Sequence, residues 1–288
     1  VSSEPLDQAR RQRLLRRLCA GAVLIACASS CHRPRQSHVA PRFADVTAEA
    51  EVARETPTYD AAIGDFDGDG RPDLYVGNHG AGAVLLRNLG NGHFVDVLPA
   101  SGIEAGGDQH GTAWTDIDND GRLDLVVALG AGRGRTTKQN RLYHNQGGGR
   151  FDDVGSSAGI SDPHGRARSA ASFDFDGDGW LDIFDANFGS PNRLFLNRHD
   201  GTFEDVSERV GLAALSATRV AWGDFDGDGR PDLLLSGTPK GIRLLHNENG
   251  ERFVDVTEAS GLGSRSGWLA GMTVGDYDND GILDLYVT

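Results

Sequence analysis

The sequence predicts an all-β protein, a β-propeller built from four-stranded blades. An aspartate-rich loop recurs five times and begins at Asp65, Asp116, Asp174, Asp224 and Asp276, so consecutive loops start about 50 to 58 residues apart. Short apolar and β-branched segments flank each loop, and the 40 glycines supply tight turns. No long helical periodicity follows residue 40. Repeats of this length with several strand-like segments each are typical of propeller blades.

The first 41 residues predict an exported, lipid-anchored N-terminus. Five arginines between residues 10 and 17 precede an apolar run at 18–26. This run is too short for a membrane span of about 20 residues but is typical of a signal peptide. It ends in "LIAC", which resembles a bacterial lipobox with Cys27 as the lipidated residue; an ordinary signal peptide cleaved elsewhere is the alternative. We therefore expect a lipoprotein-type signal peptide at 1–27, a flexible tether at 28–41, and a location in the bacterial cell envelope, outer-membrane-anchored or at the cell surface.

The blades are expected at 42–288, each with four strands. One strand precedes the loop, as in "GTAWTDID", and a second, such as "LVVAL", follows it. Two further segments, such as "RLYHN" and "RFDDV", are joined by a Gly/Asn turn. This pattern gives four complete blades and part of a fifth. The segment at 43–47, "FADVT", matches the last strand of a blade, so we expect it to pair with the final blade and close the ring.

Each loop carries aspartates at its positions 1, 3, 5 and 9. Two carboxylates about 4 Å apart repel by roughly 4 kcal/mol at an effective dielectric constant of about 20, so a cluster of four calls for a cation. Oxygen ligands in this number suit Ca²⁺, whereas Zn²⁺ would need thiolate or imidazole ligands and Mg²⁺ usually binds through one or two carboxylates. A solvated acidic turn is the alternative, but it explains one copy better than five.

The other loop positions also favour a turn wrapped around an ion. Position 6 is glycine in every copy, and position 4 is Gly or Asn, the residues that best tolerate a left-handed backbone. Position 7 varies, as expected where only the backbone carbonyl binds. An EF-hand is excluded because position 12 is never glutamate and the flanks are strand-like. We therefore expect about five Ca²⁺ ions, one per loop. The predicted ligands are Asp65, Asp67, Asp69, Arg71, Asp73, Asp116, Asp118, Asp120, Arg122, Asp124, Asp174, Asp176, Asp178, Trp180, Asp182, Asp224, Asp226, Asp228, Arg230, Asp232, Asp276, Asp278, Asp280, Ile282 and Asp284.

The charge and the cysteines agree with metal-stabilised repeats. The net charge is −14, and five Ca²⁺ ions would bring it to about −4. The acidity is thus mainly a signature of the loops, and it argues against a nucleic-acid partner. All three cysteines, Cys19, Cys27 and Cys31, precede the repeats, so we expect no disulfide framework there.

These motifs resemble the FG-GAP repeat, also called the VCBS repeat, of the calcium-binding integrin α-subunit propellers. The "F-x-D-V" strand and the "GDYDNDG" loop are most similar to bacterial proteins related to cartilage acidic protein, in which an ASPIC and UnbV domain follows the repeats. The resemblance covers 42–288 and implies Ca²⁺ binding by the side chains at positions 1, 3, 5 and 9 and by the carbonyl at position 7. It also implies a ring of about seven blades. The repeats stop at "DLYVT", partway through a fifth blade, and no ASPIC and UnbV domain follows, so we expect a truncated piece of a larger propeller; a compact five-bladed ring lacking one strand is the alternative.

The sequence favours a binding module over an enzyme. It contains no G-x-S-x-G elbow, phosphate loop or H-E-x-x-H motif. We expect structural Ca²⁺ to hold blades that bind an unknown protein or glycan at the cell surface, an adhesion-type role. The alternative is the propeller domain of a carbohydrate-active enzyme, a polysaccharide lyase or hydrolase. A cluster of His, Arg, Lys and Tyr at one end of the central channel would favour the enzyme, and a merely polar end would favour binding.

Some residues outside the loops are further candidates. Four polar residues are expected in inter-strand loops, where binding residues often gather, although each taken singly is expected to be solvated: His110, His164, Arg166 and Lys240. Trp114 and Trp222 both stand two residues before a loop, which predicts a place in the blade core. Trp180 and Trp268 lack this shared position and are candidates to stack on a sugar.

Overall fold

The computed structural model describes residues 44–52, 56, 58–79, 81–130, 139–238, 241–263 and 271–288. The signal peptide with Cys27, the tether, Lys240 and Trp268 lie outside these residues. The described fold is almost entirely β-structure, with two one-turn helices, α2 (Leu98–Ser101) and α3 (Gly155–Ala158). Neither helix has the length and apolar character that crossing a membrane would require.

The strands form antiparallel sheets that follow the sequence repeat. In the described part of the chain, four sheets have four strands and the last has two. The first sheet contains β1 (Thr58–Gly64), β2 (Asp73–Asn78), β3 (Val84–Gly90) and β4 (His93–Asp96). The second contains β5 (Gln109–Thr115), β6 (Asp124–Leu129), β7 (Arg141–Gly147) and β8 (Arg150–Asp153). The third contains β9 (Ala167–Phe173), β10 (Asp182–Asn187), β11 (Arg193–Asn197) and β12 (Phe203–Asp205). The fourth contains β13 (Arg219–Gly223), β14 (Asp232–Thr238), β15 (Gly241–Glu248) and β16 (Arg252–Asp255). The fifth contains β17 (Met272–Gly275) and β18 (Asp284–Val287).

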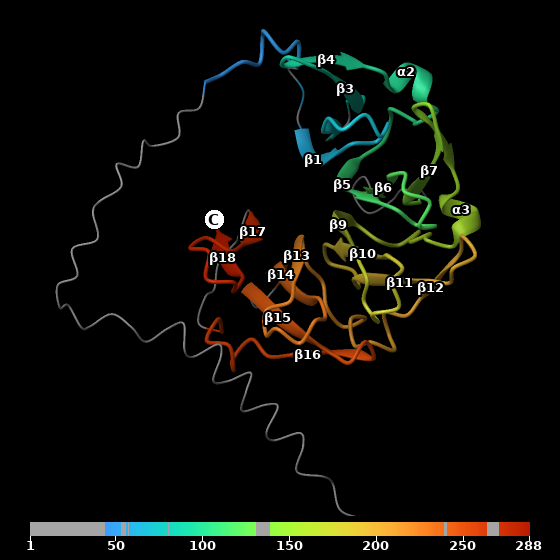
Figure 1. Ribbon diagram of the computed structural model, residues 1–288. Helices are drawn as coiled ribbons and strands as arrows, with labels where there is room; N and C mark the ends of the chain where they lie inside the picture. The colour runs from blue at the N-terminus through green and yellow to red at the C-terminus, as the bar shows by residue number, and fades with distance from the viewer. Residues whose placement is uncertain are drawn as a thin grey trace, which may run out of the picture.

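The sheets are arranged in an arc around a common centre (Figure 1). The first strand of each sheet lies innermost, and β4, β8, β12 and β16 lie toward the outer rim. Neighbouring inner strands pack on one another, β1 on β5, β5 on β9, β9 on β13, and β13 on β17. Consecutive four-stranded sheets radiating from an axis are the blades of a β-propeller. The predicted fold class is confirmed.

Each aspartate loop closes the hairpin between the first two strands of a blade. The residue before the loop pairs with the aspartate at loop position 9, for example Gly64 with Asp73 and Gly275 with Asp284, and the same register occurs in all five hairpins. The loops therefore join strand to strand, as predicted. Because each loop follows the C-terminal end of an inner strand, all five lie at the same end of the propeller.

The hydrophobic core lies between blades. Clusters of buried side chains fill the spaces between neighbouring sheets. One cluster places Phe66 and Tyr75 of the first blade against Leu125 and Phe151 of the second. The alternating apolar residues of each strand thus bury both faces of the inner sheets. Each blade depends for its stability on its neighbours.

The residues just before each loop determine how closely adjacent blades approach. The residue one position before a loop faces the residue two positions before the next loop. Gly64 faces Trp114, whose Cδ1 atom would lie 2.7 Å from a Cβ on Gly64. Phe173 packs against Trp222, with ring centroids 5.8 Å apart. The predicted core position is confirmed for Trp114, which packs against the cluster between the first and second blades. It is corrected for Trp222, which lies at the equivalent blade interface but is 46% exposed.

Residues 44–52 do not form the expected strand. The described part of the "FADVT" segment has no strand pairing, and the chain turns at 47–50. Asp45 Oδ1 accepts a hydrogen bond from the Thr47 N–H (3.0 Å), and Ala50 O accepts one from the Phe94 N–H (3.3 Å) on β4. The turn after the third blade contacts β16 in the same way, through Val210 O. Residues 47–51 thus correspond to the turn that follows the last strand of a blade. In the described residues, no strand lies beside residues 44–47 to pair with them.

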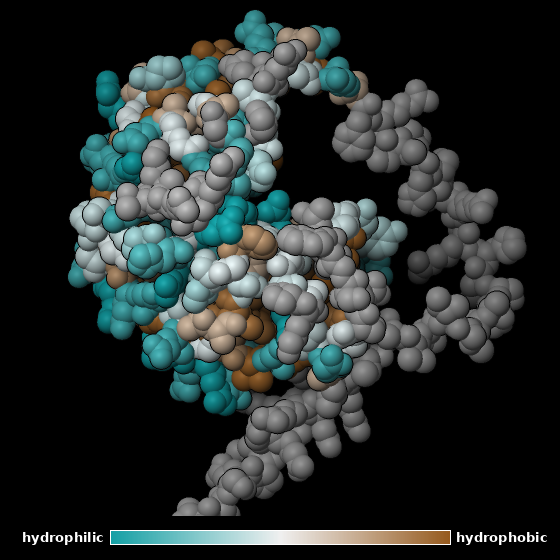
Figure 2. Space-filling model, turned by 180° about the vertical axis from the view of Figure 1, so that it is seen from behind, coloured by the Kyte–Doolittle hydropathy of each residue, from teal (hydrophilic) through white to brown (hydrophobic). Residues whose placement is uncertain are grey.

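Apolar side chains are exposed at both ends of the arc. In the first blade, Ile63 is 70% exposed, and in the fifth, Tyr277 and Tyr286 are 89% and 67% exposed. Seen from behind, polar residues cover much of the rim, and apolar patches gather in the lower half of the view (Figure 2). The first and last blades each lack, in the described residues, the neighbour that covers the equivalent face of an inner blade.

Candidate functional site

The aspartates of each loop hold the loop's own backbone. In the second loop, Asp116 accepts hydrogen bonds from the N–H groups of Asp120 (3.0 Å) and Gly121 (2.9 Å). Asp120 accepts one from the Arg122 N–H (2.8 Å). The same three bonds recur in the other loops. These side chains satisfy the amides of a tight turn, which explains why the same aspartates give the same local fold five times.

The backbone conformation of the loops agrees with the sequence. The glycines at position 6 have φ between 83° and 90°. At position 4, Asn119 and Asn279 have φ of 56° and 59°, and the glycines of the other copies are also left-handed. The prediction that positions 4 and 6 need residues tolerant of a left-handed backbone is confirmed. This turn brings the carboxylates of positions 1, 3 and 5 to one side of the loop.

The aspartate at position 9 is buried beneath the loop. Asp124 accepts hydrogen bonds from the Ile117 N–H (3.0 Å) and the Asn145 N–H (2.7 Å). The other complete blades repeat this arrangement. Burial raises the pKa of Asp124, and it raises that of Asp182 to about 7. A buried carboxylate beside further carboxylates is costly unless a cation compensates it.

The carboxylates converge as a hard cation requires. Ligand oxygens of Asp65, Asp67 and Asp73 lie within 4.8 Å of one another. The Oδ1 atoms of Asp67 and Asp118, both at position 3, are buried and have no hydrogen-bond partner in the described residues. Orphaned buried oxygens among several carboxylates fit Ca²⁺. The backbone carbonyl at position 7 is the fifth predicted ligand of each loop, and its binding to Ca²⁺ remains a prediction.

A residue on the third strand makes the loops electrostatically different. Arg87 Nε lies 2.5 Å from Asp67 Oδ2 in the first loop. His144 and His246 each place Nδ1 3.0 Å from the position 9 aspartate in the second and fourth loops. The third blade has the apolar Leu196 in the same register. Sequence analysis did not identify these residues, although each directly precedes the recurrent asparagine of the "RLYHN"-type segment.

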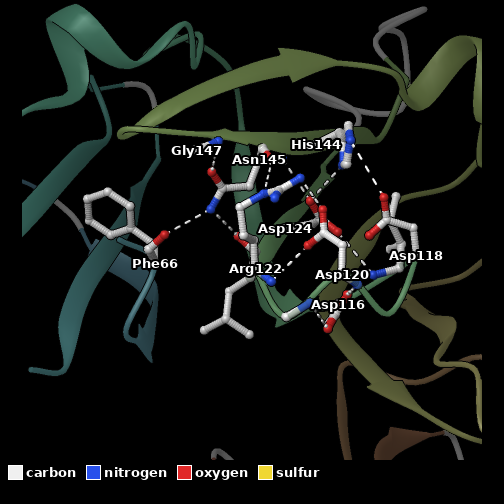
Figure 3. A network of polar contacts seen from close by, with 12 residues as sticks. Phe66, Asp116, Asp118, Asp120, Arg122, Asp124, His144, Asn145 and Gly147 are labelled. Atoms are coloured by element: carbon white, nitrogen blue, oxygen red, sulfur yellow. Dashed lines mark hydrogen bonds and ion pairs between the residues drawn. The ribbon is translucent and has the colours of Figure 1, made fainter. Parts of the chain in front are cut away.

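That asparagine links adjacent loops. Asn145 Nδ2 donates to Phe66 O at position 2 of the preceding loop (2.9 Å) and to Leu123 O of its own loop (2.9 Å), while its N–H binds Asp124 (Figure 3). Asn197 and Asn247 repeat the bond to the preceding loop at 2.9 Å and 2.8 Å. Each buried asparagine therefore connects two consecutive candidate metal loops.

The exposed loop residue Trp180 has a neighbour on its ring. The Trp180 and His199 rings stack with centroids 4.7 Å apart and planes at 18°, and His199 Nε2 lies 2.6 Å from Asp178 Oδ2. One ring face is therefore already covered. Stacking of Trp180 on a sugar remains a prediction, and the sugar would have to bind the ring face that His199 does not cover.

A second polar group lies at the opposite end of the inner strands, which we call the axial cluster. It consists of Tyr59, His79, Asp108, His110, Arg168 and Arg219. All lie at or beside the N-terminal ends of inner strands, away from the aspartate loops. Contacts between blades bring it together: His79 forms a β-bridge with Asp108, and Arg219 Nη1 donates to Arg168 O (3.2 Å).

His110 is the centre of this cluster. The sequence placed it in an inter-strand loop, but it lies in β5 and is 2% exposed, because the inner strand begins before it. Its Nε2 lies 2.8 Å from Asp108 Oδ1, and the Tyr59 ring contacts its edge at a centroid distance of 4.4 Å. Burial, aided by Arg168, lowers the pKa of His110 to about 4, so the ring is neutral at pH 7. Tyr59, His110 and Arg168 each stand six residues before an aspartate loop, so the sequence did hold a signal. Sequence reasoning missed it because the residue type at this position differs between blades, and because His79 and Asp108 come from other positions of the repeat.

The other polar candidates lie apart from one another. His164 is exposed in a turn, as expected of a solvated loop residue. Arg166 precedes β9 and lies over the Phe188 ring, with Cζ 5.1 Å from the centroid. Neither contacts the aspartate loops in any described hydrogen bond or ion pair.

Comparison with known proteins identifies the repeat. The family described as FG-GAP-like repeat matches residues 65–127, 116–184, 174–235 and 224–287, which together cover the propeller. Cartilage acidic protein 1 of Mus musculus is 31% identical over 164 residues, covering 53% of this chain and 24% of that protein. The Homo sapiens protein is 31% identical over 172 residues, covering 54% and 25%. The chain thus spans about a quarter of the length of these relatives.

Two solved structures share partial similarity. The exotype rhamnogalacturonan lyase YesX aligns with a TM-score of 0.48 at 17% identity, covering 80% of this chain and 45% of the lyase. The V. cholerae biofilm matrix protein Bap1 aligns with a TM-score of 0.42 at 18% identity, covering 81% and 35%.

Proposed function

We propose a function from the premise that this chain belongs to the FG-GAP-like repeat family. The protein is proposed to be an exported, calcium-dependent propeller that acts as a non-catalytic binding module. The observation that carries the proposal is the shared geometry of the aspartate loops. In the four complete blades the loop carboxylates lie above a buried fourth aspartate, and two of the loops contain orphaned buried oxygens. Ca²⁺ bound there would compensate the carboxylates and hold the inner hairpin of each blade.

Calcium is proposed to stabilise the fold rather than to react. Four carboxylates and a carbonyl nearly fill a shell of about 6–8 ligands. At ten times the dissociation constant, each site adds about 1.4 kcal/mol to the free energy of unfolding. Five such sites would add about 7 kcal/mol, comparable to the net stability of a domain.

A calcium titration tests this proposal. Chelated protein is titrated with Ca²⁺ by calorimetry while circular dichroism follows the folded fraction. We expect about five sites and a melting temperature that rises as they fill. A melting temperature unchanged by EDTA would refute a structural role for the loops.

The membrane anchor and the ligand belong to the same proposal. The lipobox-like "LIAC" supports lipidation of Cys27, which would display the propeller loops to a protein or glycan at the bacterial cell surface. We expect Cys27→Ala to abolish incorporation of labelled fatty acid and to release the protein from membranes. Cys31 is a poorer lipobox cysteine because Ala28 stands at its −3 position, so labelling that persists in the Cys27→Ala variant would contradict this part.

The axial cluster supports a second candidate, a carbohydrate-active enzyme. It brings His, Arg and Tyr side chains to one end of the inner strands, the feature that favours an enzyme over a binding module. Acidic polysaccharides would be the substrates to test, since Arg168 and Arg219 favour carboxylates. A lyase would leave an unsaturated, ultraviolet-absorbing product, and a hydrolase would release reducing ends. Binding without either product favours the first proposal.

A further inference from the structure

We propose that His79, Asp108 and His110 form a binding site for a divalent transition-metal ion of the Zn²⁺ class, separate from the aspartate loops. The three ligand atoms converge in space. His79 Nδ1 lies 2.5 Å from Asp108 Oδ1, His110 Nε2 lies 2.8 Å from the same oxygen, and the two ring nitrogens are 3.3 Å apart. This group combines two imidazoles with a carboxylate, whereas the groups at the second and fourth loops, which include His144 and His246, have one imidazole and two carboxylates each.

The geometry matches one face of a coordination shell. Ligands about 2.0–2.1 Å from Zn²⁺ at a tetrahedral angle lie roughly 3.3 Å apart, which is the separation of the two ring nitrogens. The two distances to Asp108 Oδ1 are shorter, 2.5 and 2.8 Å, so each would have to lengthen to roughly 3.3 Å on metal binding. His79, whose side chain is half exposed, gives that freedom.

The donor set distinguishes this site from the loops. Two imidazole nitrogens and one carboxylate oxygen suit Zn²⁺ and its neighbours, whereas the loops, dominated by carboxylate oxygens, suit Ca²⁺. Three protein ligands leave a fourth position open for water or an anionic group. Arg168 lies beside the His110 ring: a Cβ on Gly130 would be 2.4 Å from His110 Cδ2 and 2.7 Å from Arg168 Nη1. An anionic oxygen as fourth ligand would therefore find a positive neighbour.

The ligands come from two blades, which gives the site a structural consequence. His79 follows β2 in the first blade, whereas Asp108 and His110 lie at the start of the second blade, and a β-bridge pairs His79 with Asp108. A metal ion would tie the two blades at the end of the propeller opposite the loops. This inference goes beyond the proposed function, because it does not depend on Ca²⁺ binding or on a glycan ligand.

Calorimetric titration of the full chain with Zn²⁺ in excess Ca²⁺ tests the site. We expect one Zn²⁺ to bind more tightly than any other, and His79→Ala to weaken that binding by about tenfold or more. His79 is chosen because its exposed side chain can be removed with little effect on folding, which the melting temperature in Ca²⁺ would check. His164→Ala removes an exposed histidine outside the site and should leave Zn²⁺ binding unchanged.

Co²⁺ provides an independent spectroscopic readout. Bound in place of Zn²⁺, it should give the visible absorption of a four-coordinate nitrogen and oxygen site, and Asp108→Asn should weaken it. Absence of Zn²⁺ binding by the wild type would leave the three residues as a hydrogen-bonded group and overturn the proposal. Equal Zn²⁺ affinity in wild type, His79→Ala and Asp108→Asn would overturn it as well.

Discussion

The asparagine that connects neighbouring loops yields a quantitative prediction. In Asn145→Ala, Phe66 O and Leu123 O each lose a hydrogen bond of 2.9 Å, and the Gly147 N–H loses its bond to Oδ1 (2.9 Å). A hydrogen bond contributes about 0.5–1.5 kcal/mol, and a buried group left unsatisfied costs about 1–3 kcal/mol. We therefore expect Asn145→Ala to lower the free energy of unfolding by about 2–4 kcal/mol.

The first blade provides a matched control. Asn88 occupies the same position, and its N–H also binds the position 9 aspartate, Asp73 (2.7 Å). Its side chain, however, donates to Pro72 O of its own loop (2.9 Å), and no described loop precedes it. Asn88→Ala thus removes the same atoms without breaking a contact between blades. We expect a loss of only about 1 kcal/mol.

Denaturant unfolding in saturating Ca²⁺ measures both variants. The midpoint and slope give the change in the free energy of unfolding, and tryptophan fluorescence and circular dichroism should report the same transition. Asn197→Ala should resemble Asn145→Ala, since it breaks the equivalent bond to Ile117 O. If Asn88→Ala and Asn145→Ala were equally destabilising, the bond between loops would contribute nothing and the reasoning would fail.

Two further predictions concern blade contacts and a buried acid. Gly64→Ala should destabilise the protein by about 1–3 kcal/mol, because its Cβ would lie 2.7 Å from Trp114 Cδ1. Gly275→Ala, at the same loop-relative position with nothing within 4 Å, should cost little; equal melting temperatures for the two variants would refute this. Burial and nearby Asp162 raise the pKa of Asp185 to about 8, so its contribution to stability is greatest below about pH 4 and is lost as the pH rises toward 8. Asp185→Asn should therefore gain melting temperature relative to wild type at pH 8 but not at pH 4, and a constant difference across this range would contradict the assignment.

The local structure of the loops could be predicted from the sequence because their interactions are local. Asp116 binds amides four and five residues away, and a left-handed glycine permits the turn wherever the same letters recur. The four-strand repeat could be predicted for the same reason, because the same short segments recur around each loop. In contrast, the segment at 43–47 carries the letters of a strand, but strand formation requires a partner that lies elsewhere in the chain.

Features formed between blades could not be predicted in the same way. Trp114 and Trp222 share a sequence position, yet only the packed blades show that this position faces the preceding blade. His79 and Asp108 are distant in sequence and belong to different repeats, so no spacing brings them together. Asp185 was visible as the one acidic residue at loop position 12, where the other copies are apolar. The burial of Asp185 and the hydrogen bond that it accepts from Asn140 could not be predicted from the sequence.

The size matching between adjacent blades limits how the repeats can be rearranged. Removing the second blade would place Gly64 opposite Ser172 and leave a void where Trp114 now fills the interface. Removing the third would place Thr115 opposite Trp222, a larger side chain than the Ser172 it now contacts at 2.8 Å. Near-identical repeats are therefore not interchangeable. The complementary side-chain sizes at each interface favour the correct neighbouring blade and oppose mispairing during folding. Gain or loss of a blade during evolution would require paired changes at these positions.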